Sequence, residues 1–339
     1  MSAVSTLSHQ RFAVDQAAIA DARTSAAERE GRLSALLDAT SRILIESQAD
    51  AEAVGHALDG LFGGLAWQKC NSSDEEWQAA VRRCRGHRLL ECIHEDPFTA
   101  RAYHKPRGYA GDAELLDLIY GPEENWPAPQ ASPLGTAIYR YTSAAPAAEG
   151  VRARRAFIAD LIDDLTAAAP GQEILAVASG HLREASLMAA LRRRRIGRFV
   201  ALDADPISLA EVQRAYGIYG VETVPAPFSH LVTGRVKLGQ FDLVYTTGLF
   251  DYLSRSTGRR LVRTLFDMLK PGGQLIVANF MNGIRDVGFM EAFMDWRLIY
   301  RNRHDMTDLT MEIDESEVRD LTLFTEESRN IIFSRLTRI

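Results

Sequence analysis

The chain has 339 residues, of which 46% are hydrophobic, and its 39 basic and 45 acidic side chains leave a net charge of -6. This apolar content suffices for one large domain or two ordinary ones, and the acidic balance provides no general attraction to nucleic acid or to an anionic membrane. Cys70, Cys84 and Cys92 are odd in number and form no Cys-x-x-Cys pair, which argues against a disulfide framework and a zinc knuckle. No apolar run approaches the roughly 18 residues of a membrane span. We expect a cytoplasmic protein that binds no metal, nucleic acid or membrane.

Residues 1–95 are expected to form a helical N-terminal segment. From residue 16 onward, leucines recur at helical spacing, as in Leu33, Leu36 and Leu37, and the pattern continues up to Gly63-Gly64 and beyond. Apolar stripes of this kind need a partner surface. The segment is therefore expected to cap the rest of the chain or to pair with a second copy in a homodimer.

Residues 96–150 are expected to form an arm with a loop behind it. The string DPFTARAYHKPRGYAGDAELLDLIYG (96–121) is rich in aromatic and charged residues, and a proline-containing stretch follows. Lys105, Arg107, Tyr109 and Asp112 stand around two glycines in a segment too polar for a core and too aromatic for a plain surface loop. We favour a lid over a bound cofactor, which would exclude water when closed, and a structural turn is the alternative.

Residues 151–339 show the alternating strand and helix pattern of an α/β domain. A basic amphipathic helix (151–168) precedes five short apolar runs that alternate with helical patterns, at 174–178, 199–203, 222–226, 241–247 and 274–280. This alternation favours a parallel sheet covered by helices on both faces. We predict a doubly wound, Rossmann-like α/β fold.

In such a sheet, ligands bind beyond the carboxyl ends of the strands. The first strand ends at Ala178-Ser179-Gly180, where main-chain N–H groups can approach a ligand. About twenty residues later the second strand ends at Asp203, whose carboxylate can accept hydrogen bonds from both hydroxyls of a ribose. Asp205, before a proline, is either a second ligand contact or a helix cap. The other predicted cofactor positions at strand ends are Ala204, Pro227, Phe228, Thr247 and Gly248.

The string MLKPGGQLIVANF (268–280) resembles the entry into a strand typical of class I S-adenosylmethionine-dependent methyltransferases. With the acidic end of the second strand, it favours this class over a nicotinamide dehydrogenase, which would usually show G-x-G-x-x-G. The resemblance implies S-adenosylmethionine as the cofactor, which carries no phosphate and needs fewer glycines. A regulator that binds S-adenosylmethionine without catalysis stays open as an alternative.

A closer resemblance rests on KPRGYAGD (105–112), SPLGTAIYRYTSAAPAAEGVRARR (132–155), FDLVYTTGLFDYL (241–253) and FMEAFMDWRLIYR (289–301). These strings are similar to the bacterial methyltransferase family of extracellular-factor 3-hydroxypalmitic acid methyl ester biosynthesis, over about residues 96–303. The resemblance implies methylation of the carboxyl group of a hydroxy fatty acid. The chain departs from the family's Gly-Ser-Gly-Pro-Ala-Arg-Glu at Ala178 and His181, which could shape a different acceptor pocket.

The methyl acceptor decides which side chains are needed. A carboxylate needs no base but benefits from cationic donors, for which the candidates are Arg140, Arg152 and Arg301; the alternative for the arginines of the 151–168 helix is that they are simply solvated. A nitrogen acceptor needs a group that can receive a proton, and Glu291 and Asp295, one helical turn apart, are either such groups or part of a packed helix. His181 is a base or a residue that starts a helix. The candidate catalytic side chains are Tyr109, His181, Asp251, Tyr252 and Tyr300.

Overall fold

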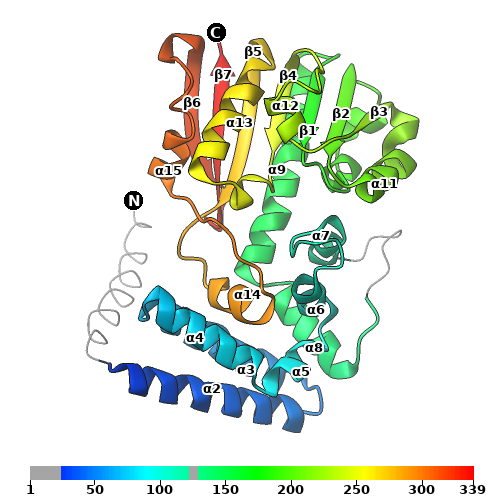
Figure 1. Cartoon of the computed structure of the whole chain (residues 1–339). Coiled ribbons are helices and arrows are strands. Elements are labelled where there is room, and N and C mark those ends of the chain that lie inside the picture. Colours follow the sequence, from blue (N-terminus) through cyan, green and yellow to red (C-terminus); the bar gives the residue numbers. More distant parts are fainter. Residues whose placement is uncertain (1–23, 122–128) are drawn as a thin grey trace, which may run out of the picture. The chain divides into compact units, whose positions relative to one another are not determined.

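The structure is a computed structural model that describes residues 24–121 and 129–339, and it divides into two compact units. Unit 1 contains the described residues up to His104, then Gln130–Tyr141 and Arg285–Trp296. Unit 2 contains the described residues between Lys105 and Pro129, then Thr142–Ile284 and Arg297–Ile339. Figure 1 labels the elements of both units. The parts of the predicted helical segment and loop at 1–23 and 122–128 lie outside the described residues.

Unit 1 is helical. Its elements are α2 (Ala26–Glu46), α3 (Ala51–Cys70), α4 (Asp74–Arg85), α5 (Leu89–Ile93), α6 (Pro97–His104), α8 (Pro133–Thr142, whose last residue belongs to unit 2) and α14 (Val287–Phe293). Ser25 and Ser73 start α2 and α4 with capping boxes, in which each serine accepts from the main-chain N–H three residues on and a glutamate carboxylate returns to the serine. The helical N-terminal segment is thus present from Ala26 onward.

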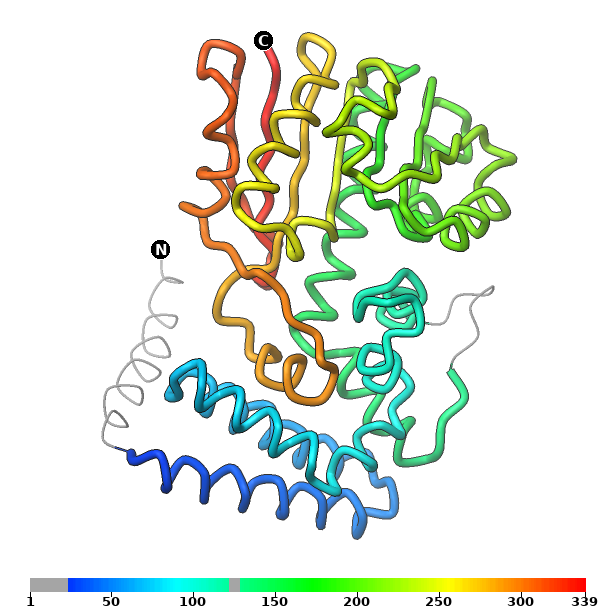
Figure 2. Tube along the Cα trace, viewed as in Figure 1, coloured from blue at the N-terminus to red at the C-terminus, as the bar shows by residue number. Residues whose placement is uncertain are grey.

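Segments far apart in the sequence build the core of unit 1. The α14 segment, orange in Figure 2, lies beside α3 and α4, and the ring of Phe289 stacks on Phe62 with the ring centres 4.3 Å apart. Helix α3 continues through Gly63-Gly64. A Cβ atom at Gly64 would lie 2.4 Å from the Leu36 side chain, so the glycine permits the close approach of α2 and α3.

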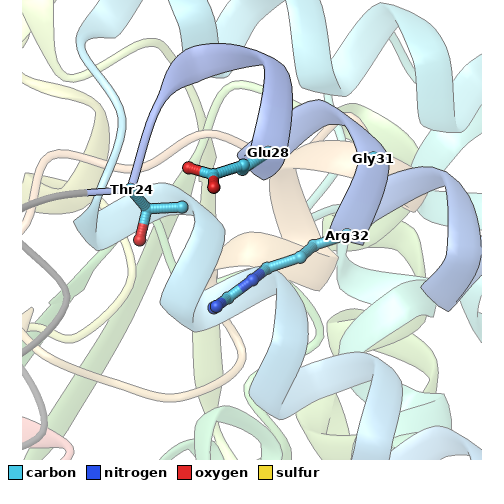
Figure 3. A pocket seen from close by; sticks show the side chains of 4 residues that line it. All are labelled: Thr24, Glu28, Gly31 and Arg32. Carbon is cyan, nitrogen blue, oxygen red and sulfur yellow. The ribbon is translucent and has the colours of Figure 1, made fainter.

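A hollow beside the first turns of α2 is lined by Thr24, Glu28, Gly31 and Arg32 (Figure 3). The Glu28 carboxylate accepts from the main-chain N–H of Ser25 in the capping box. The Arg32 guanidinium lies 4.9 Å from the centre of the Trp67 ring. Both charged groups hold the helix in place, and we assign the hollow no chemistry.

Unit 2 is built on a seven-stranded sheet in the order β3-β2-β1-β4-β5-β7-β6. The strands are β1 (Glu173–Val177), β2 (Arg198–Asp203), β3 (Val221–Pro225), β4 (Phe241–Thr246), β5 (Leu269–Phe280), β6 (Val318–Thr325) and β7 (Ile331–Arg338). The first five are parallel, and their order reverses between β1 and β4, as in doubly wound folds. Strand β7 is antiparallel to both β5 and β6. The Rossmann-like α/β fold is confirmed, but the sheet is mixed rather than wholly parallel.

Unit 2 also contains helices and 3-10 turns. They are α7 (Ala113–Tyr120), α9 (Pro146–Ala168), η1 (Arg183–Ser186), α10 (Ala189–Arg192), α11 (Pro206–Tyr216), η2 (Gly217–Tyr219), α12 (Ser229–Val232), η3 (Phe250–Tyr252), α13 (Arg255–Asp267), α15 (Arg303–Asp308) and η4 (Glu315–Glu317). Leu175 of β1 belongs to the same buried cluster as Leu265 of α13. Ile174, the residue before Leu175, lies on the opposite face of the sheet and is also fully buried. No helix in the described ranges, 24–121 and 129–339, is long and apolar enough to cross a membrane.

The Lys-Pro-Gly-Gly turn belongs to β5 itself, although the sequence suggested that it precedes the strand. The register of β5 against β4 shifts between Phe241 and Leu243. A Cβ atom at Gly273 would lie 2.9 Å from the carbonyl oxygens of Lys270 and Phe241. Glycine is therefore required where the two strands come together after the shift.

Candidate active site

The loop after β1 turns sharply because three of its residues have left-handed backbone conformations. Ala178, Gly180 and Leu182 have φ angles of 55°, 52° and 50°. A Cβ atom at Gly180 would also lie 3.3 Å from the Cβ of Ala113. A helix was expected to follow directly, but the left-handed Leu182 leads into the 3-10 turn η1 and the short α10.

Asp203, at the end of β2, is tied to this loop. Its Oδ2 accepts from the Gly180 N–H at 2.8 Å, and its Oδ1 accepts from the Asp205 N–H at 2.8 Å. The carboxyl is 9% exposed, and burial raises its pKa despite these hydrogen bonds. The main chain thus aligns a carboxylate at the junction of β1 and β2, where a ribose was expected to bind.

We expect Ala178→Gly to stabilise the protein. A left-handed conformation costs a residue with a Cβ about 1–2 kcal/mol, whereas glycine loses about 0.4–1 kcal/mol through the entropy of its unfolded chain. The net gain should be about 0.5–1 kcal/mol in the free energy of unfolding, measured by urea denaturation. Ala176→Gly, in the middle of β1, is the control and should destabilise the protein. Equal destabilisation by both changes would contradict the prediction.

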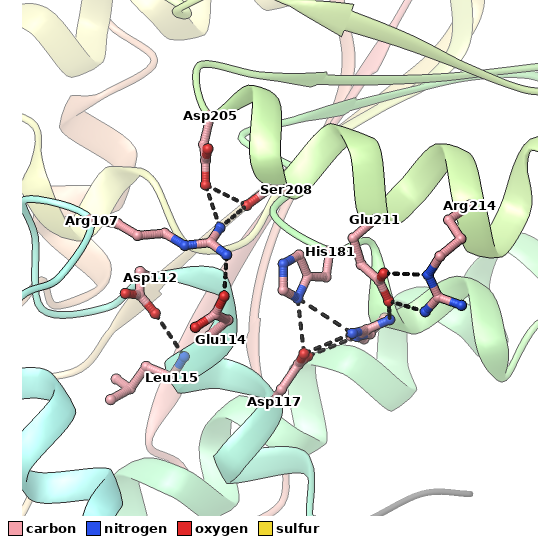
Figure 4. A network of polar contacts seen from close by, with 11 residues as sticks. Arg107, Asp112, Glu114, Leu115, Asp117, His181, Asp205, Ser208, Glu211 and Arg214 are labelled. Atoms are coloured by element: carbon pink, nitrogen blue, oxygen red, sulfur yellow. Dashed lines mark hydrogen bonds and ion pairs between the residues drawn. The ribbon is translucent and has the colours of Figure 1, made fainter. Parts of the chain in front are cut away.

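The carboxylate of Asp117 joins the arm to the loop after β1 (Figure 4). Asp117 of α7 accepts from Nε and Nη2 of Arg183 at 2.7 Å each, and from Nδ1–H of His181 at 2.9 Å. His181 and Arg183 are both buried. Burial alone would raise the pKa of Asp117, but hydrogen bonds from Arg183 and His181 hold it below its ordinary value. His181 therefore starts no α-helix, and its Nδ1 binds the arm.

A second set of contacts joins the arm to the end of β2. Arg107 donates to Asp205 Oδ2 at 2.5 Å and to Ser208 Oγ at 2.9 Å, and it pairs with Glu114 (Figure 4). Asp205 also accepts from the N–H of Ile207 at 2.9 Å and caps α11, which supports its interpretation as a helix cap.

Tyr109 is 41% exposed in the arm. Partial burial and the nearby carboxylates of Asp203, Asp112 and Asp205 raise its pKa to about 12. The phenol therefore keeps its proton near neutral pH and can donate a hydrogen bond but is not a base. Asp112 is fully buried and caps α7 by accepting from the Leu115 N–H at 2.8 Å.

Two hydroxyl groups support the fit of S-adenosylmethionine to this edge of the sheet. Ser179 follows β1 and Thr246 ends the adjacent β4, and neither hydroxyl has a hydrogen-bond partner among residues 24–121 and 129–339. Buried hydroxyls usually have one. The cofactor would bring an amino acid end for such groups and a ribose for Asp203, so the residues present suit it.

Beyond β4 and β5, a buried acid lies near two arginines. Asp251 Oδ1 accepts from the Phe280 N–H at 2.7 Å. Burial raises the pKa of Asp251 to about 6, although the charges of Arg154 and Arg301 oppose the rise. Arg301 donates to the carbonyl oxygens of Phe250 and Leu253 and to Asn279 Oδ1, at 2.5 to 2.6 Å. These bonds assign Arg301 a part in holding the segment after β4.

Asp251→Asn should stabilise the protein above pH 6. A folded pKa of about 6, against an ordinary value of 3.8, means that Asp251 favours folding most below pH 3.8 and loses that contribution as the pH rises through 6. At about 1.36 kcal/mol for each pKa unit, the ionised carboxyl costs on the order of 2–3 kcal/mol at pH 8. Urea unfolding should show the variant more stable by about 2–3 kcal/mol at pH 8, and this difference should fall to about 1 kcal/mol at pH 4.5. Equal differences at both values would contradict this.

Arg154 and Arg155 are buried, 5% and 8% exposed, so the interpretation of these helix arginines as solvated is wrong for them. Arg155 donates to the Arg183 carbonyl at 3.0 Å and to Ser186 Oγ at 2.8 Å. Arg154 lies beside Gly248 and the Phe280 ring. Arg154 was not singled out from the sequence, because the three-residue spacing of an amphipathic helix does not reveal which arginines a sheet will cover.

The remaining predicted residues are distributed over both units. In unit 2, Arg152 donates to the carbonyls of Ile119 and Ser143 at 3.0 and 2.5 Å. The other predicted positions of unit 2 lie at strand ends, in the arm or in the segment after β5, and are Lys105, Ala204, Pro227, Phe228, Thr247, Gly248, Tyr252 and Tyr300. Of these, Ala204 and Tyr252 are exposed and the others partly buried.

In unit 1, Glu291 accepts from Lys69 Nζ at 2.8 Å and from Trp77 Nε1 at 2.7 Å. Asp295 pairs with Arg85 at 2.6 Å. These contacts give both carboxylates partners on α3 and α4, as expected of a packed helix. Arg140 is exposed on α8.

Comparisons with known proteins agree with this fold. Residues 175–277 match the family model described as a methyltransferase domain. A solved structure described as that of a "possible exported protein" from Bordetella parapertussis is similar with a TM-score of 0.59 and 16% identity, over 80% of this chain and 98% of that chain. The N-methyltransferase NodS from Bradyrhizobium japonicum with S-adenosyl-L-homocysteine gives a TM-score of 0.42 and 12% identity, over 67% and 97%.

Magnesium protoporphyrin IX methyltransferase from Synechocystis, with bound S-adenosylmethionine, also gives a TM-score of 0.42 and 12% identity, over 71% and 95%. No curated protein matches the sequence. The fold and the matched domain define the class of protein, a Rossmann-like α/β transferase. Residues 175–277 thus form a methyltransferase domain, and the carboxylate and hydroxyl groups described above suit S-adenosylmethionine as its cofactor.

Proposed function

We propose that the enzyme methylates the carboxylate of a small organic acid, of the fatty or hydroxy fatty acid type. The observation that carries this proposal is the charge beyond β4 and β5, where the guanidinium groups of Arg154 and Arg301 accompany the carboxyl of Asp251, and Glu184 is a second carboxyl near Arg154. Burial raises the pKa of both carboxyls, which reduces the negative charge that they set against the guanidinium groups. A positive region favours an anionic acceptor over an ammonium group. The resemblance to the 3-hydroxypalmitic acid methyl ester family supports the same acceptor.

The cofactor supplies an activated methyl group on a sulfonium ion. A carboxylate oxygen forms the bond to the methyl carbon while the electron pair of the S–C bond stays on sulfur, which yields a methyl ester and S-adenosylhomocysteine. The acceptor is already ionised at pH 7, so no proton has to be removed. The chain must therefore align the acid and exclude water rather than provide a base.

The runner-up function is methylation of a nitrogen or hydroxyl group of a specialised metabolite. Asp251 favours it, because a carboxyl with a pKa of about 6 can receive a proton near neutral pH. A regulator that binds the cofactor without an acceptor is the remaining alternative.

We also propose that the arm is a lid. We propose further that the protein acts in the cytoplasm, where free thiols such as Cys84 persist. Finally, we propose that unit 1 mediates a homodimer, which light scattering would test.

The test is methyl transfer from labelled S-adenosylmethionine to a matched panel. The panel contains hexadecanoate, 3-hydroxyhexadecanoate and octanoate, with hexadecanamide, hexadecanol and hexadecylamine as the corresponding neutral and cationic compounds. Label in the esters of the acids, and none in the amide, alcohol or amine, is the expected result. Methylation of the amine or alcohol alone would replace the proposal with the runner-up, and cofactor binding without transfer to any compound would favour a regulator.

A further inference from the structure

We propose that Arg154 binds the carboxylate of the methyl acceptor, an inference that rests on the proposed function. Arg154 is 5% exposed, yet its guanidinium makes no hydrogen bond or ion pair with any residue in the described part of the chain. Buried arginines are almost always paired, because an uncompensated buried charge costs several kcal/mol. A guanidinium with this many donors left over is suited to bind an anion that comes from outside.

The position of Arg154 matches that of an acceptor. A Cβ atom at Gly248, just beyond β4, would lie 3.3 Å from Arg154 Nη2. The ring of Phe280, at the end of β5, has its centre 5.9 Å from the guanidinium carbon, a distance at which a cation–π interaction holds the group. In the sheet order β2-β1-β4-β5, Asp203 and Arg154 lie on opposite sides of β1. The ribose end of the cofactor is assigned to the β2 side of β1, beside Asp203. The β4 side, where Arg154 lies, is then left for the acceptor.

The charged neighbours of Arg154 are engaged elsewhere. Asp251 accepts from the Phe280 N–H at 2.7 Å, and Glu184 accepts from the Tyr245 hydroxyl at 2.6 Å. Both carboxyls act on Arg154 through charge, without an ion pair to it. Arg301 and Arg155 donate to main-chain carbonyls and polar side chains.

Arg154 is therefore the guanidinium beyond β4 and β5 whose donors are left for a ligand. Two of its donors can bind one carboxylate oxygen and leave the other to attack the methyl group. This arrangement would select monocarboxylates over the neutral amide and alcohol of the same length.

The experiment compares Arg154→Met and Arg154→Lys with wild type, and Arg260→Met, an exposed arginine of α13, is the matched control. Calorimetry measures the binding of S-adenosylhomocysteine and then of octanoate and hexadecanoate to the enzyme saturated with it. Steady-state kinetics on the acids gives KM and kcat. Circular dichroism establishes that each variant is folded, and the lysine variant keeps a charge at the site if the methionine variant does not fold.

For Arg154→Met we expect a roughly 30-fold loss of acid affinity and a similar rise in KM. A loss of this size is expected because the variant lacks a hydrogen bond between two charged groups. Arg154→Lys should lie between it and wild type, because an ammonium lacks the planar fork. S-adenosylhomocysteine should bind all variants within about twofold. Unchanged acid affinity in Arg154→Met would overturn the assignment while acid methylation by wild type still stands.

A loss of S-adenosylhomocysteine affinity would also overturn it, because Arg154 would then bind the carboxylate of the cofactor. If wild type neither binds nor methylates any acid but uses the amine or alcohol, the proposed function itself fails, and the assignment fails with it.

Discussion

Asp203→Asn is expected to weaken binding of S-adenosylmethionine by about 100-fold. The carboxylate already accepts the N–H groups of Gly180 and Asp205, and its remaining lone pairs are assigned to the two ribose hydroxyls. The asparagine amide keeps one acceptor oxygen and turns an NH₂ group toward a donor. A hydrogen bond to a charged group is worth about 1.5–3 kcal/mol, and about 3 kcal/mol corresponds to this loss. Calorimetric titration measures it.

Asp242→Asn is the control for that change. Asp242 also accepts a main-chain N–H, that of Glu173 at 2.7 Å, and pairs with Lys270, but it does so at the opposite end of the strands. It should alter stability without changing cofactor affinity. An affinity of Asp203→Asn within threefold of wild type would remove Asp203 from the cofactor site.

Asp117→Ala is expected to destabilise unit 2 by about 3 kcal/mol. The change removes the acceptor of His181 Nδ1 and of two Arg183 nitrogens, and Arg183, which is 4% exposed, keeps its ion pair with Glu211. Breaking a buried pair costs about 3–5 kcal/mol. Urea denaturation at pH 7 measures the loss.

The pH dependence gives a second measurement. Because the folded pKa of Asp117 lies below the ordinary 3.8, its contribution is present above that value and is lost as the pH falls through the folded pKa. The two proteins should therefore converge in acid. Glu114→Ala, on the same helix, removes an exposed ion pair with Arg107 and should cost less than about 1 kcal/mol. A loss for Asp117→Ala no larger than that of the control would contradict the role of Asp117.

Strands β1, β2 and β4 could be predicted because their runs are largely apolar and buried on both faces, and β3 because of its place in the alternation of strands and helices. The observed β1 to β4 begin and end within one residue of the expected runs. The hairpin of β6 and β7 could not be predicted in the same way, because β6 is only partly buried and its Val318–Thr325 sequence mixes charged and apolar residues. Such a strand is recognisable mainly from its pairing with β7.

The contacts of the site were harder to predict than its strand ends. Asp203 lies where the glycine turn and the strand pattern indicate. The partnership of His181 with Asp117 joins residues 64 positions apart, and no local pattern encodes it. Arg154 shares its helix face with residues that pack on the sheet, so its burial depends on tertiary structure.

The Asp117 contact also has a kinetic consequence under the proposed lid role. If releasing the arm costs about 3 kcal/mol, fewer than about 1 molecule in 100 has it released at any moment. The association rate of a ligand that enters beneath the arm would then be reduced in proportion to that small fraction. The release rate of S-adenosylhomocysteine would be reduced in the same way. Asp117 of α7 would thus limit the rate of each catalytic cycle, although it takes no part in the chemistry.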